Sequence, residues 1–233
     1  MKLPFDEVYL LNLCERYDKY YRMRNRIDYM GWDVKDFRVV KHPISNIIVN
    51  NMGDDLCGNG YAIYNGGVFN CTREEYTIIK SAYLNGLNTV GIIEDDCSFY
   101  KDLSVWEEYM NTLPEDWDIL RINCLRSGYE ENYCIKDGKN WVRLQSCIYG
   151  TGFYVMNRNG MKYMIDKIDR CYQPIDQPLY YYQPNKVNIY IPNIELSLCL
   201  VDSYESDIRQ NTINNPIHNY YKHIKRFKLE NYI

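Results

Sequence analysis

The chain has 233 residues and a formal net charge of −4, with 46% hydrophobic and 25% charged residues. This composition is ordinary for a globular protein, and the acidic balance argues against a nucleic acid as the main partner. No stretch approaches the ~20 apolar residues needed to span a bilayer, so no transmembrane segment is expected.

The N-terminal segment and the cysteines favour a cytoplasmic protein. Asp6 and Glu7 precede an apolar run of only a few residues, which is not a signal peptide. The nine cysteines include no Cys-x-x-Cys pair, so a zinc site is not expected and a reducing compartment is favoured. The 25 tyrosines suit sugar rings as well as protein cores, and their number alone leaves both open.

The first third of the chain predicts a strand, a helix and a second strand. Residues 8–13 form an apolar run typical of a buried strand, and residues 37–40 form a shorter one. Between them, apolar residues at helical spacing predict a helix over 16–30, with Gly31 as its C-terminal cap. Residues 41–67 are rich in Asn and Gly and predict a long loop.

Two capping-box sequences predict the starts of helices in the middle of the chain. In each, a Ser or Thr caps the helix and a Glu three residues later reaches back. The first pairs Thr72 with Glu75, and the second pairs Ser104 with Glu107. Residues 89–93 between them predict a buried strand, because they are apolar and bounded by polar residues.

The remaining pattern completes an α/β fold. Strands are expected at 117–122, 148–156 and 187–191, with a helix after the turn at 157–160. Strands that alternate with helices predict a mainly parallel central sheet. Without a repeat or a clear linker, residues 1–233 are expected to form a single domain, with a basic tail at about 213–233.

Glu94, Asp95 and Asp96 directly follow the strand at 89–93. Like charges at the end of a buried strand are costly unless a cation or strong donors neutralise them. Ligands collect at the carboxyl ends of strands in open α/β sheets, and carboxylate oxygens suit a hard divalent ion. The triplet therefore indicates either a metal site or a solvated acidic turn.

Further blocks follow the same order along the chain as in one enzyme family. They are the strand at 8–13, the block around Cys71, the Glu-Asp-Asp at 94–96, the Trp-Asp at 117–118, the Gly-bearing segment at 150–160, the Pro-x-Asp at 174–176 and the Ser-Asp-Ile at 206–208. Over residues 7–209 the chain resembles glycosyltransferase family 25, which contains bacterial lipooligosaccharide galactosyltransferases and the transferases that glycosylate collagen hydroxylysine. Two blocks depart from the family, since Cys14 replaces an Asp and Glu74-Glu75 replaces Ser-His.

The resemblance implies a nucleotide-diphospho-sugar transferase fold of the GT-A type, a divalent metal and inversion at the anomeric carbon. We expect Asp96 to bind Mn2+ or Mg2+ directly. Glu94 would bind the same ion or the donor's ribose, Asp95 would hydrogen-bond the sugar, and His218 is a candidate third metal ligand.

Other site residues follow from their places along the chain. Asn12, Arg16 and Lys19 lie at and after the end of the first strand, where such folds meet the nucleotide diphosphate. Arg16 either pairs with phosphate or belongs to a solvated helix start. Gly150 and Thr151 belong to a strand whose backbone either approaches a sugar or forms a bulge.

An inverting transfer also needs a base for the acceptor hydroxyl. Asp176 is the first candidate and Asp207 the second, with Asp202 behind them. Asp176 could equally be the N-cap of a short helix.

The expected activity is the transfer of galactose or glucose from a uridine-diphosphate (UDP) sugar. The acceptor would be a saccharide or a collagen-like hydroxylysine. The protein would act in glycan biosynthesis, in a bacterial cytosol or in the cytosol of a virus-infected host. The alternative is a non-catalytic relative that binds sugars or a protein. The replaced Ser-His supports the alternative, and the intact Glu-Asp-Asp opposes it.

Overall fold

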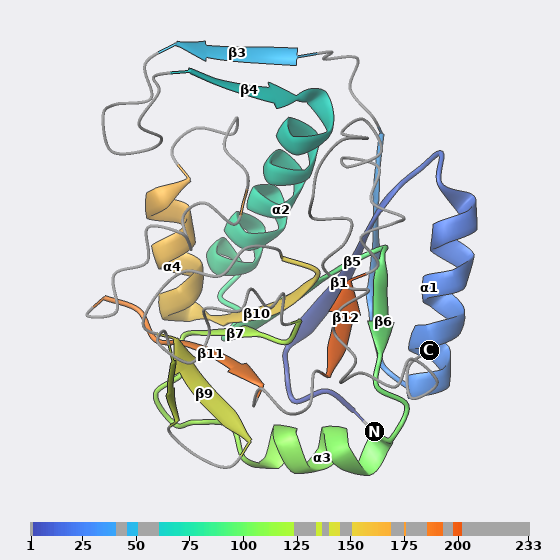
Figure 1. Cartoon of the computed structure of the whole chain (residues 1–233), viewed down its shortest axis with the longest axis vertical. Helices are drawn as coiled ribbons and strands as arrows, with labels where there is room; N and C mark the ends of the chain where they lie inside the picture. Colours follow the sequence, from blue (N-terminus) through green and yellow to red (C-terminus); the bar gives the residue numbers. More distant parts are fainter. Residues whose placement is uncertain are drawn as a thin grey trace.

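The computed structural model describes residues 2–40, 46–50, 61–123, 134–136, 140–144, 151–168, 175, 186–192 and 198–201. Its centre is an eight-stranded sheet with the strand order β2-β1-β5-β10-β7-β11-β9-β8 (Figure 1). The elements are β1 (Glu7–Leu13), α1 (Tyr17–Met30), β2 (Lys35–Val39), β3 (Asn46–Asn50), β4 (Tyr61–Asn65), α2 (Gly66–Leu84), β5 (Thr89–Glu94), β6 (Cys97–Phe99), α3 (Leu103–Asn111), β7 (Ile119–Arg121), β8 (Cys134–Lys136), β9 (Trp141–Leu144), β10 (Phe153–Asn157), α4 (Arg158–Lys167), β11 (Ile189–Pro192) and β12 (Cys199–Val201).

The α/β class is confirmed, but the sheet is mixed rather than mainly parallel. Strand β1 is parallel to β2 and β5, and β7 is parallel to β11. Strand β10 lies between β5 and β7 and is antiparallel to both, and β9 is antiparallel to β11 and β8. The direction of β10 was not predictable from its sequence, because a continuous apolar run is compatible with either direction in the sheet.

Helices cover both faces of the sheet (Figure 1). On one face, α1 and α3 pack on a core that includes Met23, Ile27, Trp106 and Phe153. On the other face, α2 and α4 pack on a second core, which includes Ile79, Val90, Tyr154 and Met161. The central strands β5 and β10 are buried on both sides, as in sheets that lie between two helical layers.

Gly31 ends α1 as predicted. Its φ of 64° lies in the left-handed region, and the N–H of Trp32 donates to the carbonyl of Ile27 at 3.2 Å. The turn places the Trp32 ring against Trp106 and Phe99, with ring centroids 4.7 Å and 4.9 Å away. The cap therefore also sets one wall of the α1-side core.

Both predicted capping boxes were wrong. Helix α2 begins at Gly66, so Thr72 and Glu75 lie inside it, 1% and 0% exposed. Helix α3 is capped by Asp102, whose carboxylate accepts from the Ser104 N–H at 2.9 Å. The ionised Asp102 carboxylate thus accepts from an N–H group that has no partner within the helix. Ser104 therefore lies inside the first turn instead of capping it.

The predicted loop at 41–67 was also wrong over the part that the structure describes. Strands β3 and β4 form an antiparallel hairpin of their own beyond the N-terminal end of α2 (Figure 1). Gly66 and Gly67 begin α2 instead of extending a loop.

Gly160 allows α4 to lie directly on β7. Asn157 caps the helix by accepting from the Gly160 N–H at 2.9 Å. A Cβ atom on Gly160 would lie 2.3 Å from the backbone oxygen of Asp118. Among the described ranges, no helix has the length and apolar character of a membrane-spanning segment.

Candidate active site at the carboxyl end of the sheet

The acidic triplet lies where β1 and β5 end, here termed the carboxyl end of the sheet. Glu94 is the last residue of β5, and Asp95 and Asp96 form the turn into β6. Because β10 runs in the opposite direction, its start reaches the same end, where the Glu94 N–H donates to the Gly152 carbonyl at 2.6 Å. The fold therefore brings together the ends of β1 and β5 and the start of β10.

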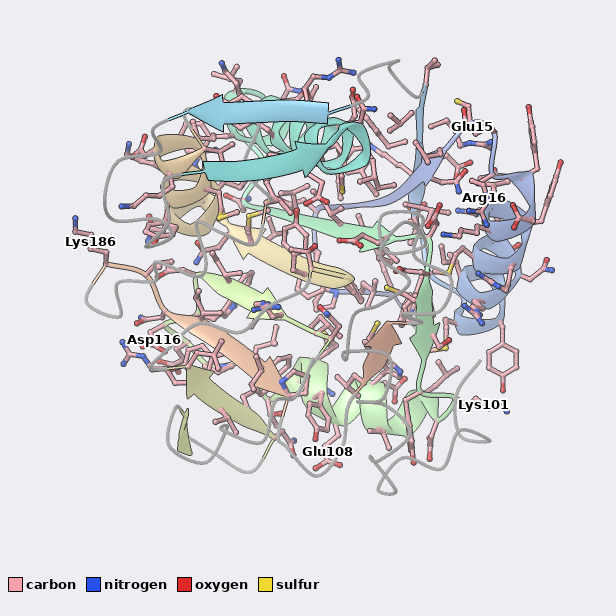
Figure 2. The ribbon with its side chains drawn as sticks, turned by 45° about the horizontal axis from the view of Figure 1, so that its top comes forward. Glu15, Arg16, Lys101, Glu108, Asp116 and Lys186 are labelled. Carbon is pink, nitrogen blue, oxygen red and sulfur yellow. The ribbon has the colours of Figure 1, made fainter. Side chains whose placement is uncertain are left out.

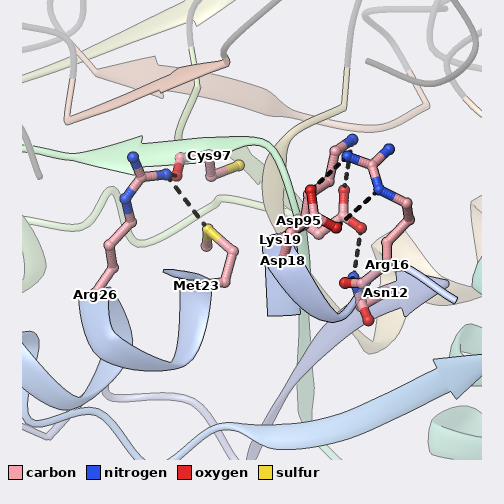
Figure 3. A network of polar contacts seen from close by, with 8 residues as sticks. All are labelled: Asn12, Arg16, Asp18, Lys19, Met23, Arg26, Asp95 and Cys97. Carbon is pink, nitrogen blue, oxygen red and sulfur yellow. Dashed lines mark hydrogen bonds and ion pairs between the residues drawn. The ribbon is translucent and has the colours of Figure 1, made fainter. Parts of the chain in front are cut away.

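Asp95 is held on the α1 side of the sheet (Figure 3). The Asn12 side-chain amide donates to one of its carboxylate oxygens at 2.6 Å, and the Lys19 ammonium lies 3.5 Å from the other. Asn12 and Lys19 are 2% and 1% exposed. Two of the three residues predicted to bind the nucleotide therefore contact the acidic turn itself.

Glu94 is held on the α2 side. The Thr151 hydroxyl donates to its carboxylate. Three atoms that could bind a metal, namely one carboxylate oxygen each of Glu94 and Glu75 and the Cys71 Sγ, all lie within 4.8 Å of one another. Cys71 and Glu75 are one turn apart on α2, and this i, i+4 spacing directs both side chains toward the end of β5.

Glu75 is a fully buried carboxylate that contacts both Cys71 and Tyr154. The Cys71 thiol donates to one oxygen at 3.0 Å, and the Tyr154 hydroxyl donates to the other. Burial raises the pKa of the Cys71 thiol and of the Tyr154 hydroxyl well above their usual values, and the negative charge of Glu75 raises both further. Both groups therefore keep their protons at neutral pH and remain donors.

These residues fit a divalent cation. Carboxylate oxygens from Glu75 and Glu94 are suitable ligands for Mn2+ or Mg2+, while the Cys71 sulfur is a softer ligand that suits Zn2+. Asp96 is 5% exposed and lies in the same turn, two residues after Glu94. The structure thus adds Cys71 and Glu75 to the surroundings of Glu94, and the role of Asp96 stays a prediction.

Arg16 forms an ion pair with Asp18. Its guanidinium contacts the Asp18 carboxylate at 3.0 Å and 2.8 Å, and this pairing lowers the pKa of Asp18. Arg16 lies with Glu15 at the start of α1, far from Asp116 and Lys186 (Figure 2). Its contact with a diphosphate stays a prediction.

The remaining predicted site residues lie outside the described part of the chain. They are Gly150, Asp176, Asp202, Asp207 and His218.

Sequence reasoning missed the group formed by Cys71, Glu75 and Tyr154. Arg121 was missed too; it is 1% exposed and in register with Tyr154 on the neighbouring strand. The i, i+4 spacing of Cys71 and Glu75 was a usable signal. The partner Tyr154 was not predictable, because it lies 79 residues from Glu75 in the chain.

No protein-family model and no curated protein match this chain. Among solved structures, it is similar to A197 from STIV, with 12% identity, a TM-score of 0.39 and 83% of each chain covered. It is also similar to a glycosyltransferase involved in the glycosylation of the major capsid of PBCV-1, with 7% identity, a TM-score of 0.43 and 88% and 96% of the two chains covered. One structural neighbour is thus a glycosyltransferase, and membership of family 25 remains a prediction.

Proposed function

We propose that the chain is a metal-dependent, inverting glycosyltransferase that takes galactose or glucose from a UDP-sugar. One observation carries the proposal. Glu94 lies at the carboxyl end of β5, and Asp96 follows in the same turn. A Glu94 carboxylate oxygen lies within 4.8 Å of the Cys71 Sγ and of a Glu75 carboxylate oxygen, which could also bind a metal. The resemblance to family 25 supplies the UDP-sugar donor and a saccharide or hydroxylysine acceptor.

Clustered carboxylates are the physical reason to propose a cation. Glu75 is fully buried and Glu94 is partly buried, so two carboxylates share a poorly solvated place. A bound cation would add to the protein donors that offset the cost of that burial. We propose Glu94 and Asp96 as ligands, with His218 as a third, and a bound Mn2+ or Mg2+ would neutralise charge on the leaving diphosphate.

The chain's own residues would orient the ligands and move the proton. The Thr151 hydroxyl fixes the Glu94 carboxylate by donating to it. Arg16 is proposed to pair with the donor's phosphates, and Gly150 to let the sugar approach the backbone. A carboxylate oxygen of Asp176, or of Asp207, would accept the proton of the acceptor hydroxyl.

The test is UDP release from a panel of UDP-sugars by the purified chain, with Mn2+, with Mg2+, with Zn2+ and with a chelator. We expect release from one donor that needs Mn2+ or Mg2+. Glu94→Gln should lower it by about 100-fold, because a neutral amide is a weaker ligand for a hard cation.

Glu107→Gln is the matched control, since Glu107 is exposed on α3, and it should retain wild-type release. Absence of both release and donor binding by calorimetry would overturn the proposed function.

A second candidate function is a non-catalytic module that binds sugars or a protein. Glu75 favours it, because the residue in place of the family's His is fully buried and engaged by Cys71 and Tyr154. Donor binding without cation-dependent release in the same panel would support this second function over the first.

A further inference from the structure

Helix α1 directs two cationic side chains at the acidic turn (Figure 3). Lys19 lies in its first turn, with its ammonium 3.5 Å from Asp95. Arg26, two turns later, donates to the backbone carbonyl of Cys97, the first residue after the turn. One helix therefore contacts the turn at Asp95 and again directly after Asp96.

The place of the Lys19 ammonium carries a free-energy cost for two reasons. An ammonium group that is 1% exposed has lost almost all of its hydration, which must be offset by a counter-charge. It also lies in the first turn of a helix, where the positive end of the helix dipole disfavours a cation. The ion pair with Asp95 therefore helps to offset both costs.

Asp95 is engaged at both carboxylate oxygens. One accepts from the Asn12 amide at 2.6 Å and the other faces the Lys19 ammonium. Asn12 also donates to the Arg16 carbonyl at 3.3 Å, which ties the end of β1 to the start of α1. The contacts direct Asp95 toward the α1 face, whereas Glu94 is directed toward the α2 face.

We propose that Lys19 is a positioning residue that acts through Asp95. It anchors Asp95 to α1, and so fixes the backbone on which Glu94 and Asp96 are presented to a divalent cation. The inference rests on the proposed function. It differs from the earlier expectation, in which Lys19 met the donor's diphosphate and Asp95 met the sugar.

The test is direct Mn2+ binding, followed by electron paramagnetic resonance without any donor. Lys19→Met keeps the apolar stem and removes the charge. It should weaken Mn2+ binding by about 10-fold to 100-fold, as loss of a group that supports a metal ligand does. Lys19→Arg should restore most of the affinity. Lys35→Met is the matched control, because Lys35 lies on β2 with an ammonium that contacts Glu7 instead, and it should leave Mn2+ binding unchanged.

A double-mutant cycle tests whether the effect passes through Asp95. Asp95→Asn removes the counter-charge with little change in shape, and should weaken Mn2+ binding to a similar extent. The double variant that combines Lys19→Met with Asp95→Asn should bind Mn2+ no more weakly than the single variant with the lower affinity. Both substitutions remove the same interaction between Lys19 and Asp95. Additive losses would show that Lys19 acts independently of Asp95 and would overturn the proposal.

Donor binding separates positioning from direct contact. At saturating Mn2+, Lys19→Met should keep its KM for the donor within about threefold while kcat falls, because no donor contact is lost. A large rise in KM, or weaker UDP binding without a cation, would show that Lys19 touches the diphosphate. Lack of Mn2+ binding by the wild type, together with a lack of cation-dependent UDP release, would overturn the proposed function. Wild-type binding that Lys19→Met leaves unchanged would overturn only this inference.

Discussion

Glu94 and Asp95 are neighbours in the chain but belong to different groups of side chains. Glu94 contacts Thr151 and lies beside Cys71 and Glu75, whereas Asp95 contacts Asn12 and Lys19. At the end of a strand, adjacent side chains point to opposite faces, so a run of like charges is divided between two environments. The division reduces repulsion within the triplet and gives each carboxylate its own partners.

Gly160 offers a test of packing at a single residue. Gly160→Ala would place a methyl group 2.3 Å from the Asp118 carbonyl oxygen, which is backbone and has little room to move. We expect a loss of about 1–3 kcal/mol or more in the free energy of unfolding, measured by urea denaturation. Asn159→Ala is the control, because Asn159 is exposed on the same turn of α4, and its effect should stay within about 0.5 kcal/mol. Equal stability of Gly160→Ala and the wild type would contradict this packing.

Two substitutions at the start of α3 distinguish the observed cap, Asp102, from the predicted cap, Ser104. Asp102→Ala removes the acceptor for the Ser104 N–H and should lower the free energy of unfolding. Ser104→Ala keeps that backbone bond and should cost less. Thermal unfolding of the two variants checks the order, and a larger loss for Ser104→Ala would restore the capping box.

The elements that could be predicted carry their signals locally. Strands β1 and β5 are short apolar runs, and Gly31 supplies the left-handed residue that ends α1. The start of α2 was missed because glycines at 66 and 67 resemble loop residues when only the sequence is visible. Helix propensity is a weak guide where tertiary contacts decide, and α2 packs against α4 and β5.

For the whole molecule, the composition and the alternation of elements were enough for the α/β class, and the triplet was enough to locate the candidate site. The contacts that build the site were not predictable. Asn12 and Asp95 are 83 residues apart, and Glu75 and Tyr154 are 79 apart. Such pairs depend on which strands become neighbours, and that order is a property of the folded sheet.

The stability of the folded molecule in acid should depend on Glu7. The Lys35 ammonium and the Tyr9 hydroxyl donate to its carboxylate and lower the pKa of Glu7 below its usual 4.5. A lowered pKa in the folded state gives stability that is present above that pH and is lost as the pH falls through the folded value. Between about pH 6 and about pH 3, the Tm of Glu7→Gln should therefore fall less than that of the wild type.

Lys35→Met removes the main donor and should flatten the same pH profile. If Glu7→Gln showed the wild-type dependence of Tm on pH, the Glu7–Lys35 ion pair between β1 and β2 would not contribute to that dependence. Melting curves across this pH range, followed by circular dichroism, measure both variants.

The place of β10 between β5 and β7 has a consequence for how the protein is made. On the ribosome, β1, β2 and β5 are all available to pair once residue 94 has emerged, but the second neighbour of β5 ends only at residue 157. During that interval the nascent sheet ends in β5, an apolar strand with one unpaired row of backbone groups. Unpaired strand edges recruit other chains, so translation between β5 and β10 leaves an aggregation-prone edge exposed.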